Sequence, residues 1–335
     1  MAVLFATSPR YLDHLAGIGH PERPARLEAV LAGARRAGVA DALIPLEPRA
    51  ATLDELTRVH PPEYVAALQR VCANGGGHLD ADTSVVPASW DAAVLAAGSG
   101  LAAIEALDRG EAPAAFCAVR PPGHHATATD AMGFCLLNNV AVAAAHLAAR
   151  GERVAIIDYD AHHGNGTQDI FYADPRVFYI SMHQFPLYPG SGRLFERGVG
   201  LAEGTTMNFP FPPGTTGDVY LMAIDRVVLP VLEMFGPTWV LISAGFDAHI
   251  RDPLTDLALT SGDFARMTAR LLSIAKPGRR LAMLEGGYDL QALESSSAVA
   301  LSVLAGETPD PDEDATSGGP GLRIVDAAIE MWQPF

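Results

Sequence analysis

The sequence predicts an α/β fold in which a mainly parallel sheet is covered by helices on both faces. Two observations support this prediction. Short β-rich runs alternate with longer alanine-rich helical segments along almost the whole chain, and the central runs are continuously apolar. A strand with one face in water alternates apolar and polar residues, whereas a strand covered on both faces is apolar throughout. The pattern is therefore typical of a doubly wound α/β protein.

The expected elements follow from this alternation. We expect strands at residues 3–6, 114–119, 153–160, 177–183, 239–245 and 280–287. We expect helices at residues 23–38, 61–74, 88–108, 137–150, 217–235, 261–275 and 290–305. A single domain is expected over residues 1–335, in which the acidic, Pro- and Gly-rich segment 306–321 forms a surface loop before a C-terminal helix.

The composition limits the classes of partner. Asp and Glu outnumber Lys and Arg by 39 to 23, which gives a formal net charge of −16. Such a field repels phosphate backbones and attracts cationic small molecules or Lys-rich peptides, so we expect no direct nucleic-acid partner. No continuous apolar stretch predicts a membrane span, and the start of the chain has neither a basic region nor a small-residue cleavage site. We expect a cytoplasmic protein without a membrane partner, and oligomer formation stays open.

The cysteines do not predict a disulfide framework. Cys72, Cys117 and Cys135 occur singly, and the sequence has no CxxC pair. This spacing argues against structural disulfides and against a Cys-rich zinc site. We expect reduced thiols in or near the core.

Ionisable side chains follow four of the expected strands. They are His124 and His125 after 114–119, Asp158, Asp160 and His162 at the end of 153–160, Asp247 after 239–245, and Tyr288 after 280–287. In open α/β sheets the ligand crevice lies outside the carboxyl ends of the strands. Because four separate strand ends carry such groups, we expect one functional site rather than isolated structural polar residues.

Asp160, His162 and Asp247 are candidate metal ligands. Asp160 and His162 are two residues apart on an extended segment and can point the same way, while Asp247 comes from another strand end. A water-activating metal centre keeps about three protein ligands and an open position. Two carboxylates and one imidazole suit zinc first, with iron(II), cobalt or manganese as alternatives.

The remaining strand-end residues can move protons and bind an oxyanion. A metal-bound water needs a proton acceptor, which His124 and His125 can supply, and Asp158 can orient one imidazole and raise its basicity. Tyr288 follows two glycines, which let the chain fold closely and aim the phenol at a developing oxyanion. The set is complete for metal-assisted hydrolysis of an amide or an ester.

Several motifs carry a resemblance to a known family. RPPGHHA, GFCLLNNVAVAA, DYDAHHGNGTQDIFY, SAGFDAH and LEGGYD closely resemble the histone deacetylase family, including its class II-like bacterial amidohydrolases, acetylpolyamine amidohydrolases and acetoin-utilisation proteins. The likeness runs from about residue 17 to residue 300. It implies a three-layer αβα arginase/deacetylase-like fold with a central, mainly parallel eight-stranded sheet. It also implies a deacetylase that acts on linear amide C–N bonds.

The resemblance implies roles around the metal. Asp160, His162 and Asp247 would hold zinc, for which iron(II) or cobalt can substitute, and Tyr288 would polarise the substrate carbonyl. Members of the family also bind a structural potassium ion below the zinc. The positions that match this second site are Asp158, Asp160, His162, Ser181 and Met182.

The tandem histidines have different implied roles. By resemblance, His125 is general base and then general acid, while His124 gives electrostatic help and pairs with Asp158. Asn165, in HHGNG, is the implied partner of His125. The class I branch has an aspartate at this position and the class II branch an asparagine, so Asn165 indicates the class II branch. A neutral partner should stabilise a protonated His125 less strongly.

A substrate tunnel is also implied by the resemblance. Phe134 and Tyr188 match aromatic positions on either side of an acyl-lysine chain, and the carbonyl of Gly133 matches the acceptor of the amide N–H. His20 belongs to an early loop that borders the mouth. Leu254, in RDPLTD, stands where the eukaryotic polyamine deacetylase has a gatekeeper glutamate, which weighs against strict polyamine specificity by this device.

The sequence thus predicts a zinc-dependent hydrolase that removes an acyl group, expected to be acetyl, from an acylated primary amine such as acetyl-lysine or a small acetylated amine or polyamine. Three alternatives stay open. An acetylpolyamine-specific amidohydrolase could use Asp80 and Asp82 to attract a cation, although a solvated acidic turn explains them as well. A ureohydrolase-like enzyme would need a second metal. A non-catalytic protein would bind the acyl-amine without turning it over.

Overall fold

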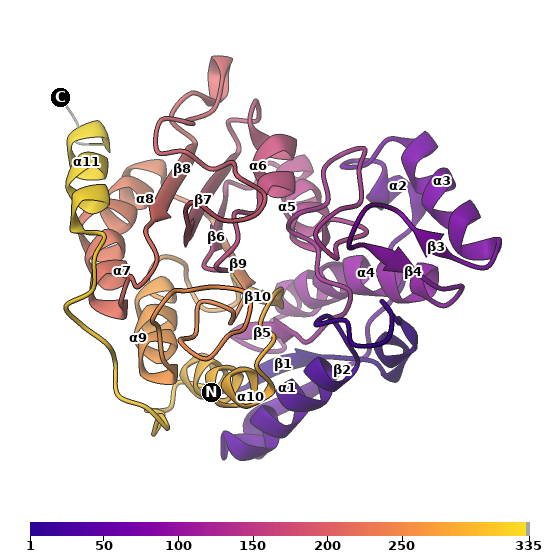
Figure 1. The fold of residues 1–335 in the computed structure, drawn as a ribbon, viewed down its shortest axis with the longest axis horizontal. Coiled ribbons are helices and arrows are strands. Elements are labelled where there is room, and N and C mark those ends of the chain that lie inside the picture. The colour runs from indigo at the N-terminus through magenta and orange to yellow at the C-terminus, as the bar shows by residue number, and fades with distance from the viewer. Residues whose placement is uncertain (333–335) are drawn as a thin grey trace.

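An eight-stranded sheet forms the centre of the structure, a computed structural model that describes residues 1–332 of the 335-residue chain. Neighbouring strands follow the order β2-β1-β5-β10-β9-β6-β7-β8 (Figure 1). Every pairing in this sheet is parallel. The strands are β1 Val3–Ala6, β2 Leu43–Leu46, β5 Ala114–Cys117, β6 Val154–Asp158, β7 Val177–Gln184, β8 Thr206–Phe211, β9 Trp239–Ala244 and β10 Arg280–Leu284. The predicted α/β class and eight-stranded parallel sheet are confirmed.

Helices cover both faces of this sheet, whereas α2 and α3 lie to its side (Figure 1). The helices are α1 Ala25–Arg36, α2 Leu53–Leu56, α3 Pro62–Ala73, α4 Ser89–Asp108, α5 Asn139–Ala149, α6 Asn165–Phe171, α7 Gly217–Ala223, α8 Leu229–Phe235, α9 Ser261–Leu271, α10 Leu290–Leu304 and α11 Leu322–Trp332. In one layer α10 packs between α1 and α9, and in the other α4 packs on α5. A small antiparallel pair, β3 Gly77–His78 and β4 Ser84–Val85, lies apart from the main sheet.

The central strands place the polar residues that follow them. Every residue of β5, β6 and β9 is buried, as their continuous apolar sequences predict. In the sheet β5, β10, β9 and β6 are consecutive neighbours and parallel, so their carboxyl ends lie side by side. The loops that carry the ionisable residues therefore begin along one edge of the sheet.

The two edge strands, β2 and β8, were not predicted from the sequence. Each contains a proline, Pro45 and Pro210, which removes a ladder donor and interrupts the apolar pattern. An edge strand has a neighbour on one side only, so it tolerates a proline that a central strand excludes. A criterion based on continuous apolar runs misses such strands.

The helix predicted at 217–235 is continuous but changes geometry. A π-helical turn, Ile224–Val228, joins α7 to α8. Pro230 follows this turn and has no N–H to donate to the carbonyl four residues earlier. The wider turn is the type of local adjustment found within α-helices at such irregularities.

By length and composition alone, α4 could cross a membrane. In the structure, however, 83% of its apolar window is buried inside the protein. It packs on α5 and on β1, β5 and β10, which is the environment of a core helix.

Segment 306–321 runs to α11 without helix or strand and is held against the fold. Glu313 Oε2 lies 3.2 Å from His249 Nε2, and the N–H of Thr316 lies 3.1 Å from the Asp263 carboxylate. These contacts tie the acidic segment to the loop after β9 and to the start of α9. The single-domain organisation of the whole chain stays a prediction.

Candidate active site

The three predicted metal ligands converge at the carboxyl ends of β6 and β9. Asp160 and His162 lie just after β6, Asp247 lies just after β9, and all three are buried. His162 Nδ1 is 3.3 Å from Asp160 Oδ1 and 3.0 Å from Asp247 Oδ2. One ligand atom from each residue lies within 4.8 Å of the others. The arrangement leaves two carboxylate oxygens and one imidazole nitrogen facing a common point.

The electrostatics of this trio favour a cation. Burial, followed by the nearby charge of Asp160, raises the pKa of Asp247 to about 7. Burial opposes protonation of His162, but its hydrogen bonds with the two carboxylates raise its pKa to about 10. The raised pKa favours a protonated His162, which places a positive charge between the two buried carboxylates. A divalent metal ion would supply that charge, and the O, N, O donor set fits zinc.

Glycines make room for both carboxylates. A Cβ atom at Gly245 would lie 2.0 Å from Asp160 Oδ2. One at Gly286 would lie 2.3 Å from Asp247 Oδ2 and 2.6 Å from Asp160 Oδ2. Any side chain at these two positions would therefore displace the candidate ligands.

The tandem histidines lie beside the trio and have separate partners. His124 Nδ1 is 3.0 Å from Asp158 Oδ2, and His125 Nδ1 is 2.8 Å from Asn165 Oδ1. The two imidazole rings are 4.1 Å apart, and the ring of His125 is 6.0 Å from that of His162. These are the pairings that the resemblance implied.

The two histidines differ in charge preference. Burial lowers the pKa of His124, but Asp160 and Asp158 outweigh it and raise that pKa well above its ordinary value. Burial, then the neighbouring His124 and His162, lowers the pKa of His125 well below its ordinary value. These surroundings therefore favour the charged form of His124 more than that of His125. With Nδ1–H donated to Asn165, His125 keeps a lone pair on Nε2.

Four of the five predicted substrate residues, all except His20, line a cavity of about 230 Å³. It is lined by Asp82, His125, Gly133, Phe134, His162, Leu187, Tyr188, Leu254 and Tyr288. The ring of Tyr188 meets that of His125 edge-on at 5.2 Å, and the ring of Phe134 meets that of Tyr288 edge-on at 5.8 Å. Phe134, Tyr188 and Tyr288 therefore line the cavity together with the candidate ligand His162.

His20 does not line this cavity but supports its wall. Its ring packs edge-on against Phe134 at 4.6 Å, and its Nε2 lies 3.0 Å from the carbonyl of Asp82. Phe134 has a positive φ of 69°, which is unusual for a non-glycine residue. The N–H of Phe134 donates to Thr83 Oγ1 at 3.0 Å, a contact that helps to hold this conformation.

The positions matched to the potassium site are only partly brought together. Asp158 and Ser181 are paired in the β6–β7 register. Ser181 Oγ lies 2.8 Å from His183 Nδ1, and the carbonyl of Met182 accepts a hydrogen bond from the hydroxyl of Tyr220 at 3.3 Å. Potassium binding stays a prediction.

Sequence reasoning missed the residues that hold Tyr288. The guanidinium of Arg26 lies 4.8 Å from the centre of the Tyr288 ring, and its Nε donates to the carbonyl of Gly287 at 2.7 Å. The buried carboxylate of Asp252 accepts the N–H of Tyr288 at 2.7 Å. Both residues lie far from Tyr288 in the sequence, so motif spacing gave no signal for them.

A buried ion-pair network stands behind this support. Glu22, two residues after His20 in the same early loop, is fully buried. Its carboxylate contacts Arg120 Nε at 2.5 Å and Arg26 Nη1 at 3.2 Å. With these two partners, the pKa of Glu22 falls to about 2 despite its burial. The network fixes Arg26 beneath Tyr288.

Comparisons with known proteins identify the family. The sequence profile described as the histone deacetylase domain matches residues 20–304. A probable deacetylase of Archaeoglobus fulgidus is 44% identical over 303 residues, which cover 88% of this chain and 84% of the relative. The histone deacetylase-like amidohydrolase of Pseudomonas aeruginosa is 40% identical over 261 residues, which cover 76% and 68% of the two chains. The crystal structure of the HDA15 HD domain matches with a TM-score of 0.90 and 38% identity, over 99% of this chain and 95% of that chain.

Fold and sequence together define a hydrolase of the deacetylase and amidohydrolase type, with an arginase/deacetylase-like fold. The chain belongs to the histone deacetylase family. Members of this family are generally metal-dependent and act on acetylated substrates, which agrees with the candidate ligand trio.

Proposed function

We propose that this protein is a zinc-dependent deacylase that removes an acetyl group from an acylated primary amine. The observation that carries the proposal is that His125, Tyr288 and the candidate ligand His162 line one cavity. Asp160 and Asp247 contact His162 at 3.3 and 3.0 Å. Acetyl-lysine in a protein or peptide and a small acetylated amine both present the required linear amide. Iron(II) or cobalt could replace zinc at the same ligands.

Asp160, His162 and Asp247 would hold the metal. When bound, zinc polarises an acyl oxygen and lowers the pKa of a water molecule. Asp158, Asp160, His162, Ser181 and Met182 are the candidates for a structural potassium site.

The chain's own residues would carry the protons. His125 Nε2 accepts a proton from the attacking water, with Asn165 orienting the ring through Nδ1, and the protonated ring then donates to the leaving amine. His124, held protonated by Asp158, adds positive charge beside the developing oxyanion. The phenol of Tyr288 donates a hydrogen bond to the acyl oxygen.

Residues of the cavity would orient the substrate. Phe134 and Tyr188 flank the alkyl chain, and the carbonyl of Gly133 accepts the amide N–H. In the structure that carbonyl accepts the Cys135 thiol at 3.3 Å, so the substrate N–H would share it. His20 orients Phe134 from behind, and Leu254 lines the cavity without adding charge.

The alternatives differ in metal content and turnover. A polyamine-specific enzyme would rely on Asp82, which lines the cavity and is exposed. A ureohydrolase would bind two divalent metal ions per chain, and a non-catalytic binder would release no acetate. We favour the general deacylase because the protein-lined cavity adjoins one O, N, O ligand trio.

The deciding experiment measures metal content and turnover of the same preparation. We expect about one zinc per chain and chelator-sensitive acetate release. The values of kcat/KM should then be compared for acetyl-lysine peptides and for N-acetylated putrescine, cadaverine and spermidine. A preference above about a hundredfold, equivalent to about 2.7 kcal/mol, would define the substrate class. Two divalent metal ions per chain, or no acetate from any substrate, would contradict the proposal.

A further inference from the structure

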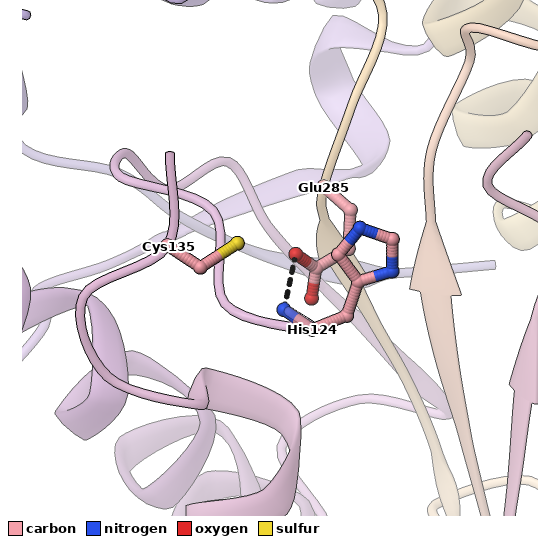
Figure 2. Close-up of side chains that lie close together, drawn as sticks. All are labelled: His124, Cys135 and Glu285. Carbon is pink, nitrogen blue, oxygen red and sulfur yellow. Dashed lines mark hydrogen bonds between the residues drawn. The ribbon is translucent and has the colours of Figure 1, made fainter. Parts of the chain in front are cut away.

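Glu285 is a buried carboxylate to which the motif LEGGYD gave no role. It lies directly after β10, and its side chain is fully buried. Its Oε2 accepts the backbone N–H of Gly123 at 2.6 Å and that of His124 at 3.1 Å. Figure 2 shows this carboxylate pointing at the backbone of His124, while the thiol of Cys135 points toward it from the other side. The group therefore touches the loop that carries both histidines.

A metal site at this cluster is disfavoured. Ligand atoms of His124, Cys135 and Glu285 lie within 4.8 Å of one another. However, burial raises the pKa of the Cys135 thiol well above its ordinary value, and the thiol donates to the Gly133 carbonyl. Glu285 Oε2 is already engaged by two N–H groups. The contacts are those of a hydrogen-bonded support.

The histidine loop has no regular structure of its own between β5 and α5. Other residues bind the carbonyl groups of this loop. Asn139 Nδ2 donates to the carbonyl of Pro121 at 3.0 Å, and the N–H of Thr167 donates to the carbonyl of His124 at 3.1 Å. Glu285 is the acceptor for the N–H groups of Gly123 and His124. Without it these two buried donors would lose their partner, which the loop could recover only by moving.

We propose that Glu285 is a positioning residue, whose carboxylate fixes the backbone of Gly123 and His124 so that the tandem histidines face the candidate metal ligands. The inference rests on the proposed function for its catalytic consequence. The backbone of Glu285 is itself fixed, because its carbonyl accepts a hydrogen bond from Arg26 Nη2 at 2.5 Å. Tyr288 follows three residues later. The end of β10 therefore sets the position of the histidines relative to the phenol.

The hydrogen bonding of Glu285 defines matched variants. Its Oε1 has no hydrogen-bond partner within residues 1–332, so Oε2 alone accepts the two backbone N–H groups. Glu285→Gln keeps an acceptor at the same reach and cannot ionise. Glu285→Asp keeps the carboxyl group and withdraws the acceptor by one methylene group, and Glu285→Met fills the space without an acceptor.

We expect the acceptor, not the charge, to determine activity. Glu285→Gln should keep kcat within about fivefold of the unchanged chain, whereas Glu285→Asp and Glu285→Met should lower kcat by about thirtyfold to a hundredfold. KM and zinc content should change less than about threefold, because the aromatic residues of the cavity wall and the ligand trio are untouched. Equal losses for Gln and Met, or full kcat for Asp and Met, would overturn the proposal.

Amide hydrogen exchange of the segment 121–126 supplies a readout that does not depend on turnover. Exchange should be slow in the unchanged chain and in Glu285→Gln, and about tenfold faster or more in Glu285→Asp and Glu285→Met. Unaltered exchange in all variants would overturn the positioning role. Should Glu285→Met not fold, the Gln and Asp variants still give opposite expectations.

A control separates positioning from general destabilisation. Asp263, in the first turn of α9, is also buried. Its carboxylate accepts the N–H groups of Thr260 and of Thr316, which lies in segment 306–321. Asp263→Leu should lower the melting temperature but leave kcat and exchange at 121–126 unchanged. If the unchanged chain releases no acetate, the proposed function fails, while the exchange result still decides whether Glu285 holds the loop.

Discussion

The floor and the rim of the candidate active site are built differently. The floor consists of His124, His125, Asp160, His162 and Asp247, which are buried and hydrogen-bonded. The rim consists of Asp82, Leu187, Tyr188 and Leu254, whose side chains are partly or largely exposed, Tyr188 to 39%. The difference indicates that the floor sets the chemistry, while the rim can vary the substrate at little cost to the fold.

The largest effect should come from removing charge at the floor. Asp247→Asn keeps an oxygen that can accept the N–H of Ala161, now at 2.7 Å, but weakens the ligand trio. We expect loss of bound zinc and a fall in kcat/KM of about a thousandfold or more, because several kcal/mol of metal-assisted stabilisation disappear. Metal analysis and acetate release check this. Full zinc content in the variant would remove Asp247 from the ligand set.

A smaller loss of activity is expected for a change at Tyr288, which lies in the cavity wall. Tyr288→Phe removes only the hydroxyl, and Arg26 and Asp252 should still hold the ring and backbone. We expect kcat to fall by about a hundredfold to a thousandfold, with zinc content and KM nearly unchanged. Kinetics on the zinc-loaded variant measure this. Equal activity would exclude the phenol from the mechanism.

The buried residue His60, which holds the start of α5, predicts that the stability of the fold depends on pH. His60 Nε2 accepts the N–H of Asn138, the cap of α5, at 3.0 Å, and burial lowers the pKa of His60 to about 4. The unfolded chain takes up this proton near pH 6.5, so stability is full above that pH and is lost as pH falls toward 4. The contribution lost between pH 7 and pH 5 is about 2 kcal/mol.

Urea unfolding at pH 7 and pH 5 measures this loss. His60→Gln retains one donor and one acceptor but does not titrate, so its free energy of unfolding should fall less over the same interval. His78, which is exposed, provides the control, since His78→Gln should leave the pH dependence unchanged. An identical pH dependence for the unchanged chain and His60→Gln would contradict the assignment.

The sequence predicted the floor better than its supports. Asp160 and His162 share one motif, and Asp247 follows another predicted strand, so the rule that parallel strand ends meet at one edge of the sheet was sufficient to group them. Glu285 and Asp252 instead accept backbone N–H groups from loops that lie far away in the sequence. Such pairs depend on how loops pack, and neither periodicity nor motif spacing encodes that.

A similar distinction holds for the fold. The buried strands β6 and β9 were predicted because continuous burial demands continuous apolar sequence. The edge strands β2 and β8 carry prolines and have one neighbour each, so their pairing depends on the sheet already formed. Local sequence therefore specifies the centre of the sheet more strongly than its edges.

The smallest predicted effect concerns the rim. Leu254→Glu places a carboxylate in the cavity lining, where Leu254 is half-buried and now adds no charge. We expect kcat/KM to shift by about threefold to tenfold toward N-acetylspermidine relative to a neutral acetyl-lysine peptide, because a partly solvated ion pair contributes about 1 kcal/mol. The preference should weaken at high salt. Leu254→Gln is the matched control without charge. A fall in kcat on both substrates would instead show that this part of the rim also governs the chemistry, and would break the division between floor and rim.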